Sequence, residues 1–244
     1  MNVNKALTFV FEDDQWVGKI LLGTVISLIP LFGGAAVTGY TIAVVRTVRE
    51  GRSHRLPTWD RLGDYFVDGL LYWVALLIYS IPLLILVCPI ALVWVLPAAS
   101  NDRQGLTTAL TTVAAVVSAG LGCLALLYAL LLWAVAPVLQ IRYAEAGRLG
   151  ACLRFADVFR FLFANVGPIV IAQILVWAAG LVATTVLGLV IGAFGLVPIC
   201  GWVVASLLGL VFLPLGVWLM LFAAHLYADI GRAPEAELSV VSPT

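Results

Sequence analysis

The chain has 244 residues, of which 63% are hydrophobic and only 11% are charged, and its formal net charge is zero. An ordinary soluble domain carries about 25% charged residues, and a globule of this size needs polar side chains to cover its surface. The composition, with a mean hydropathy of +1.12, therefore excludes an ordinary soluble domain. The zero net charge gives no global electrostatic basis for binding nucleic acid.

Charged residues are missing from four long intervals of the chain. These are residues 20–45, 69–101, 104–141 and 161–228. An α-helix needs about 20 apolar residues to cross the hydrocarbon of a membrane, and the last interval is long enough for two helices. The runs are continuously apolar rather than alternating, which favours helices over a β-barrel. The predicted fold class is all-α: an integral membrane bundle of about five hydrophobic helices with interfacial amphipathic helices.

The N-terminal residues 1–18 are predicted to form an interfacial amphipathic segment, with Trp16 as an anchor at the headgroup level. Acidic residues precede the first apolar run, unlike in a cleaved signal peptide, so we expect the N-terminus to be retained. The first apolar segment, residues 20–45, contains Pro30 and, shortly after it, two glycines. We interpret this segment as one tilted span with a kink. The alternative is a re-entrant hairpin whose two short arms meet at the proline and glycines, and the side on which the N-terminus lies depends on this choice.

The remaining hydrophobic helices belong to one predicted transmembrane domain, residues 19–229, which is followed by a polar tail, residues 230–244. These helices are expected at residues 66–96, 106–141, 166–192 and 202–227. Residues 147–165 are predicted to form an amphipathic helix on the membrane, with its aromatic face toward the acyl boundary and its basic face toward water and headgroups. The predicted anchors on this helix are Phe155 and Phe159, and its candidate contacts with lipid headgroups are Arg148, Arg154 and Arg160.

Arginines are concentrated in two of the polar loops. Five lie in the first loop and four in the second, so the two loops hold nine of the thirteen cations. They are Arg46, Arg49, Arg52, Arg55 and Arg61 in the first loop, and Arg142, Arg148, Arg154 and Arg160 in the second. Two predicted spans separate the loops, which places both on one side of the membrane. Because basic loops mark the cytoplasmic side, we predict a multi-pass protein of a prokaryotic plasma membrane, with both loops and the C-terminus in the cytoplasm.

An aspartate stripe lies at the entrance to the second hydrophobic segment. Asp60, Asp64 and Asp68 are spaced four residues apart, which places three carboxylates on one helical face. We interpret the stripe as part of a structural ion-pair cluster with loop arginines, and a cation or proton site is the alternative. The arginines of this predicted cluster are Arg49, Arg52, Arg55 and Arg61, and the adjacent Trp59 is predicted to be an interface anchor.

Motifs that carry chemistry are absent from the sequence. The four cysteines lie far apart without Cys-x-x-Cys spacing, and the two histidines form no metal-binding pattern. No nucleophile elbow, phosphate-binding loop or zinc-protease motif occurs. We therefore predict no catalytic residue, no metal site and no cofactor. No ionisable residue lies deep in a predicted span, which counts against an ion-coupled transporter.

The first third of the chain carries a recognisable pattern. Its residues are Phe11, Asp14, Trp16 and Lys19, then Pro30, then Gly39, Tyr40, Arg46, Arg49 and Gly51, and finally Leu56-Pro57-x-Trp59-Asp60 and Asp68-Gly69. The pattern resembles a bacterial and archaeal family of polytopic membrane proteins known as domain of unknown function 4013. The second half, ending in His225-Leu226-Tyr227-x-Asp229, is more loosely similar to the membrane domains attached to some glycerophosphodiester phosphodiesterases. The resemblance implies a membrane topology and no reaction, because the chain has no phosphodiesterase catalytic domain.

The sequence therefore favours a non-enzymatic integral membrane protein with a structural, assembly or lipid- and protein-interaction role. Its expected partners are membrane lipids, including anionic ones, and other membrane proteins, with no nucleic acid. The alternative is a transporter or channel for a small solute or a lipid.

Overall fold

The computed structural model describes residues 3–51, 56–99, 104–195 and 200–230, but not the side chains of residues 3, 96–99, 104–107 and 200. Within these ranges the chain is helical and contains no strand, so the all-α prediction is confirmed. The α-helices and two short 3-10 helices (η) are α1 Val3–Thr8, η1 Phe9–Glu12, α2 Trp16–Ser27, α3 Phe32–Arg49, η2 Trp59–Arg61, α4 Leu62–Ala99, α5 Gln104–Ala146, α6 Leu149–Cys152, α7 Phe155–Ala164, α8 Val166–Gly195, α9 Cys200–Gly209 and α10 Phe212–Ile230. Beyond Ile230, the predicted polar tail lies outside the described residues.

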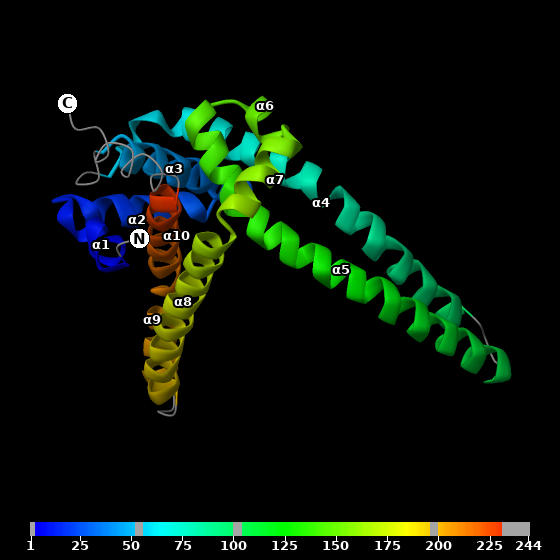
Figure 1. The fold of residues 1–244 in the computed structure, drawn as a ribbon. Helices are drawn as coiled ribbons and strands as arrows, with labels where there is room; N and C mark the ends of the chain where they lie inside the picture. Colours follow the sequence, from blue (N-terminus) through cyan, green and yellow to red (C-terminus); the bar gives the residue numbers. More distant parts are fainter. Residues whose placement is uncertain (1–2, 52–55, 100–103, 196–199, 231–244) are drawn as a thin grey trace.

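The helices form two long hairpins that diverge from a common head (Figure 1). One hairpin consists of α4 and α5, and the other consists of α8 packed against α9 and α10. The short helices α1, α2, α3, α6 and α7 gather at the end where the hairpins meet (Figure 1). The chain thus has a head built from many short elements and two legs built from long ones.

Four helical stretches in the described part of the chain are long and apolar enough to cross a membrane, judged by length and composition. They are Trp59–Val95, Thr108–Ala146, Val166–Gly195 and Gly201–Ile230. Many of their large apolar side chains are exposed, as at Trp177, which is 68% exposed. Apolar surface of this extent needs hydrocarbon rather than water around it. These stretches match four of the five predicted hydrophobic helices.

The remaining predicted helix, residues 20–45, is the first in chain order. It is a helical hairpin rather than the single span that we preferred. Helices α2 and α3 pack against each other and are joined by residues 28–31. The indole Nε1 of Trp59 donates to the carbonyl of Lys19 over 3.0 Å, so the start of α2 lies beside the loop that follows α3. Pro30 explains the break, because it has no N–H with which to continue the helix. The apolar turn is open to its surroundings, and Leu31 is 81% exposed.

Two other predicted helices are interrupted. The span predicted at residues 202–227 consists of α9 and α10, with Pro214 in the first turn of α10 unable to donate to the carbonyl of Leu210. The amphipathic helix predicted at residues 147–165 is divided into α6 and α7. Gly147, with a φ of 61°, ends α5 and turns the chain toward α6. Helix α7 remains amphipathic, since its Val158 is buried while its phenylalanine row is partly exposed.

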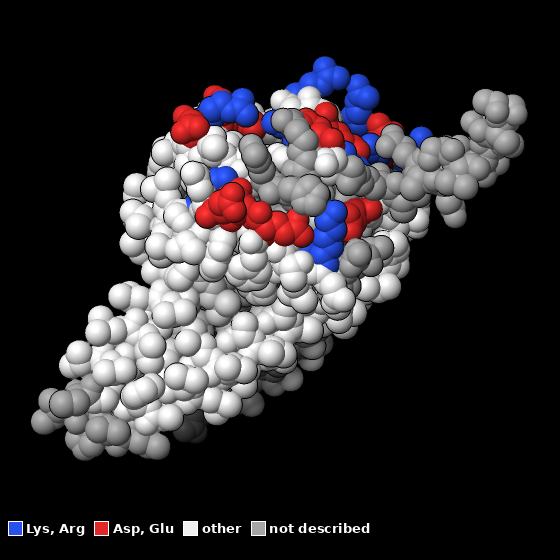
Figure 2. Space-filling model, turned by 90° about the vertical axis from the view of Figure 1, so that its left-hand side faces the viewer, with Lys and Arg blue, Asp and Glu red and all other residues white. Residues whose placement is uncertain are grey.

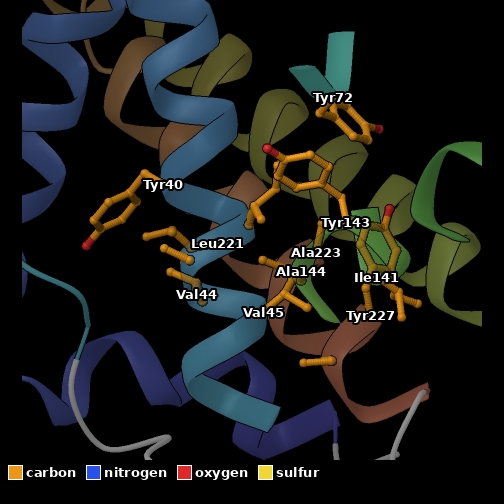
Figure 3. Close-up of a cluster of buried hydrophobic side chains, with 14 of the residues drawn as sticks. Tyr40, Val44, Val45, Tyr72, Ile141, Tyr143, Ala144, Leu221, Ala223 and Tyr227 are labelled. Carbon is orange, nitrogen blue, oxygen red and sulfur yellow. The ribbon is translucent and has the colours of Figure 1, made fainter. Parts of the chain in front are cut away.

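The buried core lies where α3, α4, α5 and α10 meet. Figure 3 shows the side chains that fill it: Tyr40, Val44 and Val45 of α3, Tyr72 of α4, Ile141, Tyr143 and Ala144 of α5, and Leu221, Ala223 and Tyr227 of α10. Helices α3 and α4 approach closely at Gly39 and Gly69. A Cβ atom added at Gly39 would lie 1.8 Å from the Tyr65 carbonyl oxygen, and one added at Gly69 would lie 1.8 Å from that of Ala35. Only glycine permits backbones this close.

A chain of hydrogen bonds ties the two hairpins together where they diverge. Pro137, inside α5, cannot donate to the carbonyl of Trp133. The side chain of Gln173 on α8 donates its Nε2 to this carbonyl over 2.8 Å. Its Oε1 accepts from the hydroxyl of Tyr227 on α10 over 2.6 Å. An unsatisfied carbonyl in an apolar environment costs several kcal/mol, so the proline break in α5 is repaired by the neighbouring helices.

Candidate functional site: the charged head

Charged side chains gather at one end of the molecule (Figure 2). On the face shown, the blue and red side chains lie over the upper end and the lower part is white. We call this end the charged head, and its members discussed below are Asp13, Lys19, Arg46, Arg49, Glu50, Asp60, Arg61, Asp64, Asp68, Arg142, Glu145, Arg148, Arg154 and Asp157. They come from both Arg-rich loops and from the N-terminal segment, which the fold brings together.

Asp13 fastens the N-terminal segment to the first loop. Its carboxylate accepts from Lys19 Nζ at 2.7 Å and from the backbone N–H groups of Gln15 and Leu56, each at 2.8 Å. The residue is only 5% exposed. Burial alone raises the pKa of Asp13, but the hydrogen bond from Lys19 and those from the two N–H groups outweigh it, so the pKa lies below its ordinary value. Asp13 is therefore a buried, ionised residue that joins the N-terminal segment to the first loop.

The rest of the N-terminal segment also packs into the protein. Phe9 and Val10 are buried, and the Phe9 ring lies 4.5 Å from the ring of His225 on α10, measured between centroids. Only part of the segment fits the predicted interfacial placement. Phe11 is exposed, and it meets the half-buried Trp16 edge to face at 4.9 Å.

Trp59 lies in the core, which corrects its prediction as an interface anchor. It is 7% exposed, and its ring stacks on Tyr40 at 4.0 Å between centroids. The Tyr40 hydroxyl donates to the carbonyl of Pro57 over 2.9 Å. Trp59 therefore fixes the first loop to α2 and α3 inside the protein, where an aromatic pair adds to the area it buries.

A polar cavity of about 770 Å³ opens between the end of α3, the start of α4 and the end of α5. Its charged lining residues are three arginines, Arg46, Arg49 and Arg61, and four acidic residues, Glu50, Asp64, Asp68 and Glu145. Because the cavity presents both guanidinium and carboxylate groups, it suits a polar ligand with separated charges or an anion held by the arginines.

The walls of this cavity are held by specific contacts between α3, α4 and α5. Arg46 donates its Nε to the Ala144 carbonyl at 3.1 Å, and Arg49 forms an ion pair with Glu145. The hydroxyl of Tyr143 donates to Asp68 Oδ1 at 2.9 Å. These contacts join residues that lie far apart in the chain. They place residues of both Arg-rich loops around one site.

The structure separates the members of the predicted ion-pair cluster. Asp64 and Asp68 line the polar cavity, whereas Asp60 lines a neighbouring one with Lys19 and Trp59. Arg49 pairs with Glu145 rather than with the stripe, and no ion pair joins the three aspartates to an arginine in the described part of the chain. Arg52 and Arg55 lie outside the described residues. Among those residues, no group of three His, Cys, Asp or Glu side chains could hold a metal ion.

The second Arg-rich loop forms a smaller cavity of about 200 Å³ beside the first. Arg148 and Arg154, two predicted headgroup contacts, line it together with Arg142. Arg160, the third predicted contact, is exposed on α7 and does not line it. Of the predicted anchors, Phe155 is half exposed and lies 4.9 Å from the ring of Tyr79. Phe159 is half-buried beside the same tyrosine at 6.4 Å.

Three residues that make contacts within the charged head were not predicted from the sequence: Asp13, Tyr143 and Glu145. Asp13 lies 43 residues from its partner Leu56, and Glu145 lies 96 residues from Arg49. The one local signal was the spacing of Arg142 and Glu145, which pair across one helical turn at 3.4 Å.

Four apolar helices long enough to cross a membrane, joined to a charged head, define a polytopic α-helical membrane protein. The model of a family described as "protein of unknown function (DUF4013)" matches residues 22–192. The chain belongs to this family, and the matched residues run from α2 to α8 and include the polar cavity. No curated protein and no solved structure matches the chain. The looser likeness of the second half to phosphodiesterase-attached membrane domains stays a prediction.

Proposed function

We propose that this protein has a non-enzymatic structural or assembly role in the membrane, in which its charged head binds lipid headgroups and other membrane proteins. One observation carries the proposal: a charged cavity, lined by three arginines and four carboxylates, lies between α3, α4 and α5, at the end from which the long apolar helices extend (Figure 1). If those helices cross the membrane, the cavity lies at its surface. Arginine binds phosphate and carboxylate groups with several donors, and basic residues gain from the negative surface potential of anionic lipids.

Polar groups within the long helices support a structural role. The Nε2 of Gln140 on α5 donates to the hydroxyl of Thr41 on α3 over 2.9 Å. Gln173 joins α5, α8 and α10 in the same manner. These groups are used in contacts between helices, and such contacts stabilise helix packing in membranes. A transporter or channel for a small solute or lipid is the alternative that the following experiment addresses.

The proposal predicts lipid retention without flux. Protein purified from a membrane that contains phosphatidylglycerol should retain this lipid in native mass spectrometry, and Arg61→Gln should lower the amount retained. Liposomes containing the protein should release a trapped fluorescent solute, and exchange a labelled lipid between leaflets, no faster than protein-free liposomes. Flux that depends on the protein would contradict the proposal and favour a transporter or channel.

We further infer that the head faces the cytoplasm of a prokaryotic cell, with the Arg-rich loops and the C-terminus on that side. Because α2 and α3 form a hairpin, the N-terminal segment belongs to the same side. In a cysteine-free background, cysteines at Arg148 and Arg154 should resist an impermeant maleimide added outside intact cells. A cysteine at Asp102, between α4 and α5, should be labelled and serves as the control. Labelling of either head position from outside contradicts this orientation.

A further inference from the structure

We propose that the smaller cavity of the charged head is a binding site for the phosphate of an anionic lipid headgroup, formed by Arg142, Arg148 and Arg154. The cavity lies between the end of α5, α6 and the start of α7, and its other charged lining residues are Glu145 and Asp157. This inference rests on the proposed function and names the ligand class and the residues of one site within it.

The size and charge of the cavity fit one phosphate group. Its volume of about 200 Å³ equals that of about seven water molecules, each occupying about 30 Å³ in the liquid, which is room for a phosphate group and a few waters. Three arginines and two carboxylates line the cavity. One of these carboxylates, Glu145, also forms an ion pair with Arg49, which lines the larger polar cavity. The cavity therefore carries an excess of positive charge, and an anion is the ligand that balances it.

Arg142 is positioned for a ligand but incompletely used by the protein. Its guanidinium lies over the ring of Phe161, 4.8 Å from the centroid, and its contact with Glu145 is long at 3.4 Å. Its Nε is buried and has no hydrogen-bond partner within the described structure. The Arg142 side chain as a whole is 31% exposed and lines the cavity, so its guanidinium group can still donate to a phosphate oxygen there.

Arg148 and Arg154 are exposed, and neither forms an ion pair with a residue in the described ranges. Both side chains are therefore available to close on an anion. Arg148 directly precedes α6 and Arg154 directly precedes α7, and both line the same cavity as Arg142. Arginine is suited to this role because its planar fork matches the oxygens of a phosphate.

Helix α7 indicates that the phosphate belongs to a lipid. Helix α7, which follows Arg154 directly and contributes Asp157 to the cavity, presents exposed phenylalanines, with Phe155 at 48% and Phe163 at 71% exposure. An amphipathic helix with aromatic residues on one face and charges on the other lies at the boundary between acyl chains and headgroups. A phosphodiester at headgroup depth therefore meets the cavity without leaving the membrane.

The test uses the full-length protein in nanodiscs made from equal amounts of phosphatidylcholine and phosphatidylglycerol. Native mass spectrometry counts the retained phosphatidylglycerol relative to phosphatidylcholine. Arg148→Gln and Arg154→Gln should each lower this ratio about tenfold or more, as expected when a charge-assisted hydrogen bond to the bound phosphate is lost. Asp157→Asn should raise the ratio, because it removes a carboxylate that repels the phosphate. Arg160→Gln, on α7 but outside the cavity, should lower the ratio by no more than about fivefold, because Arg160 acts only through the general attraction of a basic residue to an anionic surface.

A second arm adds inorganic phosphate to the detergent-solubilised protein and follows its melting temperature. An increase that disappears in Arg148→Gln supports the phosphate site with a soluble ligand, whereas no increase beside a changed lipid ratio assigns the site to lipid. Equal losses in the Arg148, Arg154 and Arg160 variants would overturn the site while leaving lipid binding by the head intact. If the wild-type protein shows no preference for phosphatidylglycerol and no response to phosphate, lipid binding by the head fails as well.

Discussion

Alanine at Gly69 should separate helices α3 and α4 and lower the stability of the head by about 3 kcal/mol, at the upper end of the usual cost of overpacking. The added Cβ would lie 1.8 Å from the carbonyl oxygen of Ala35, and backbone atoms cannot rotate away as a side chain does. Gly39→Ala should behave in the same way, because its Cβ would meet the Tyr65 carbonyl oxygen at 1.8 Å. Thermal melting of the detergent-solubilised variants measures the effect.

The matched control is Gly63→Ala, in the same helix α4 and less than two turns before Gly69. No atom lies within 4 Å of a Cβ added there, so the change should be neutral or should stabilise the helix by up to about 1 kcal/mol. If Gly69→Ala melted at the same temperature as Gly63→Ala, the close approach of α3 and α4 would be wrong. The double variant Gly39→Ala and Gly69→Ala should cost less than the sum of the single changes, since one displacement relieves both contacts.

Asp13→Ala should destabilise the head by about 3–5 kcal/mol, because it leaves the largely buried ammonium of Lys19 without its counter-charge. It also leaves two backbone N–H groups without their acceptor. The adjacent Asp14→Ala is the control, since Asp14 is exposed and its replacement should change stability by less than about 0.5 kcal/mol. Combining Asp13→Ala with Lys19→Met should recover part of the loss, because no buried charge then remains unpaired.

The lowered pKa of Asp13 also predicts a pH dependence of stability. The carboxylate is stabilised in the folded protein, so its contribution is complete above the unfolded pKa of about 3.9 and is lost as the pH falls through the folded value. The wild-type melting temperature should therefore fall on acidification below about pH 4 more steeply than that of Asp13→Ala. Parallel curves for the two proteins would contradict the assignment of an ionised, buried carboxylate.

The membrane helices were predictable because their physical requirement is local. A charge in hydrocarbon is costly wherever it stands, so the charge-free intervals of the sequence mark the spans without knowledge of their neighbours. The same rule predicted that charges would collect between the spans, and both Arg-rich loops lie in the head. The family resemblance could also be recognised locally, because residues that carry it, such as Gly39 and Gly69, are visible in the sequence before their contacts are known.

The tertiary structure decided what depends on partners distant in sequence. Pro30 interrupts a helix in either interpretation of residues 20–45, and only the meeting of Lys19 with Trp59 shows that the chain turns back. A tryptophan at the start of an apolar segment is typical of an interface anchor, but Trp59 stacks on Tyr40 of α3 and lies in the core. Glu145 is an isolated acid among arginines in the sequence, and it acquires a role when α3 brings Arg49 beside it. Local polarity and backbone chemistry determined the helices, whereas long-range packing and charge pairing determined the site.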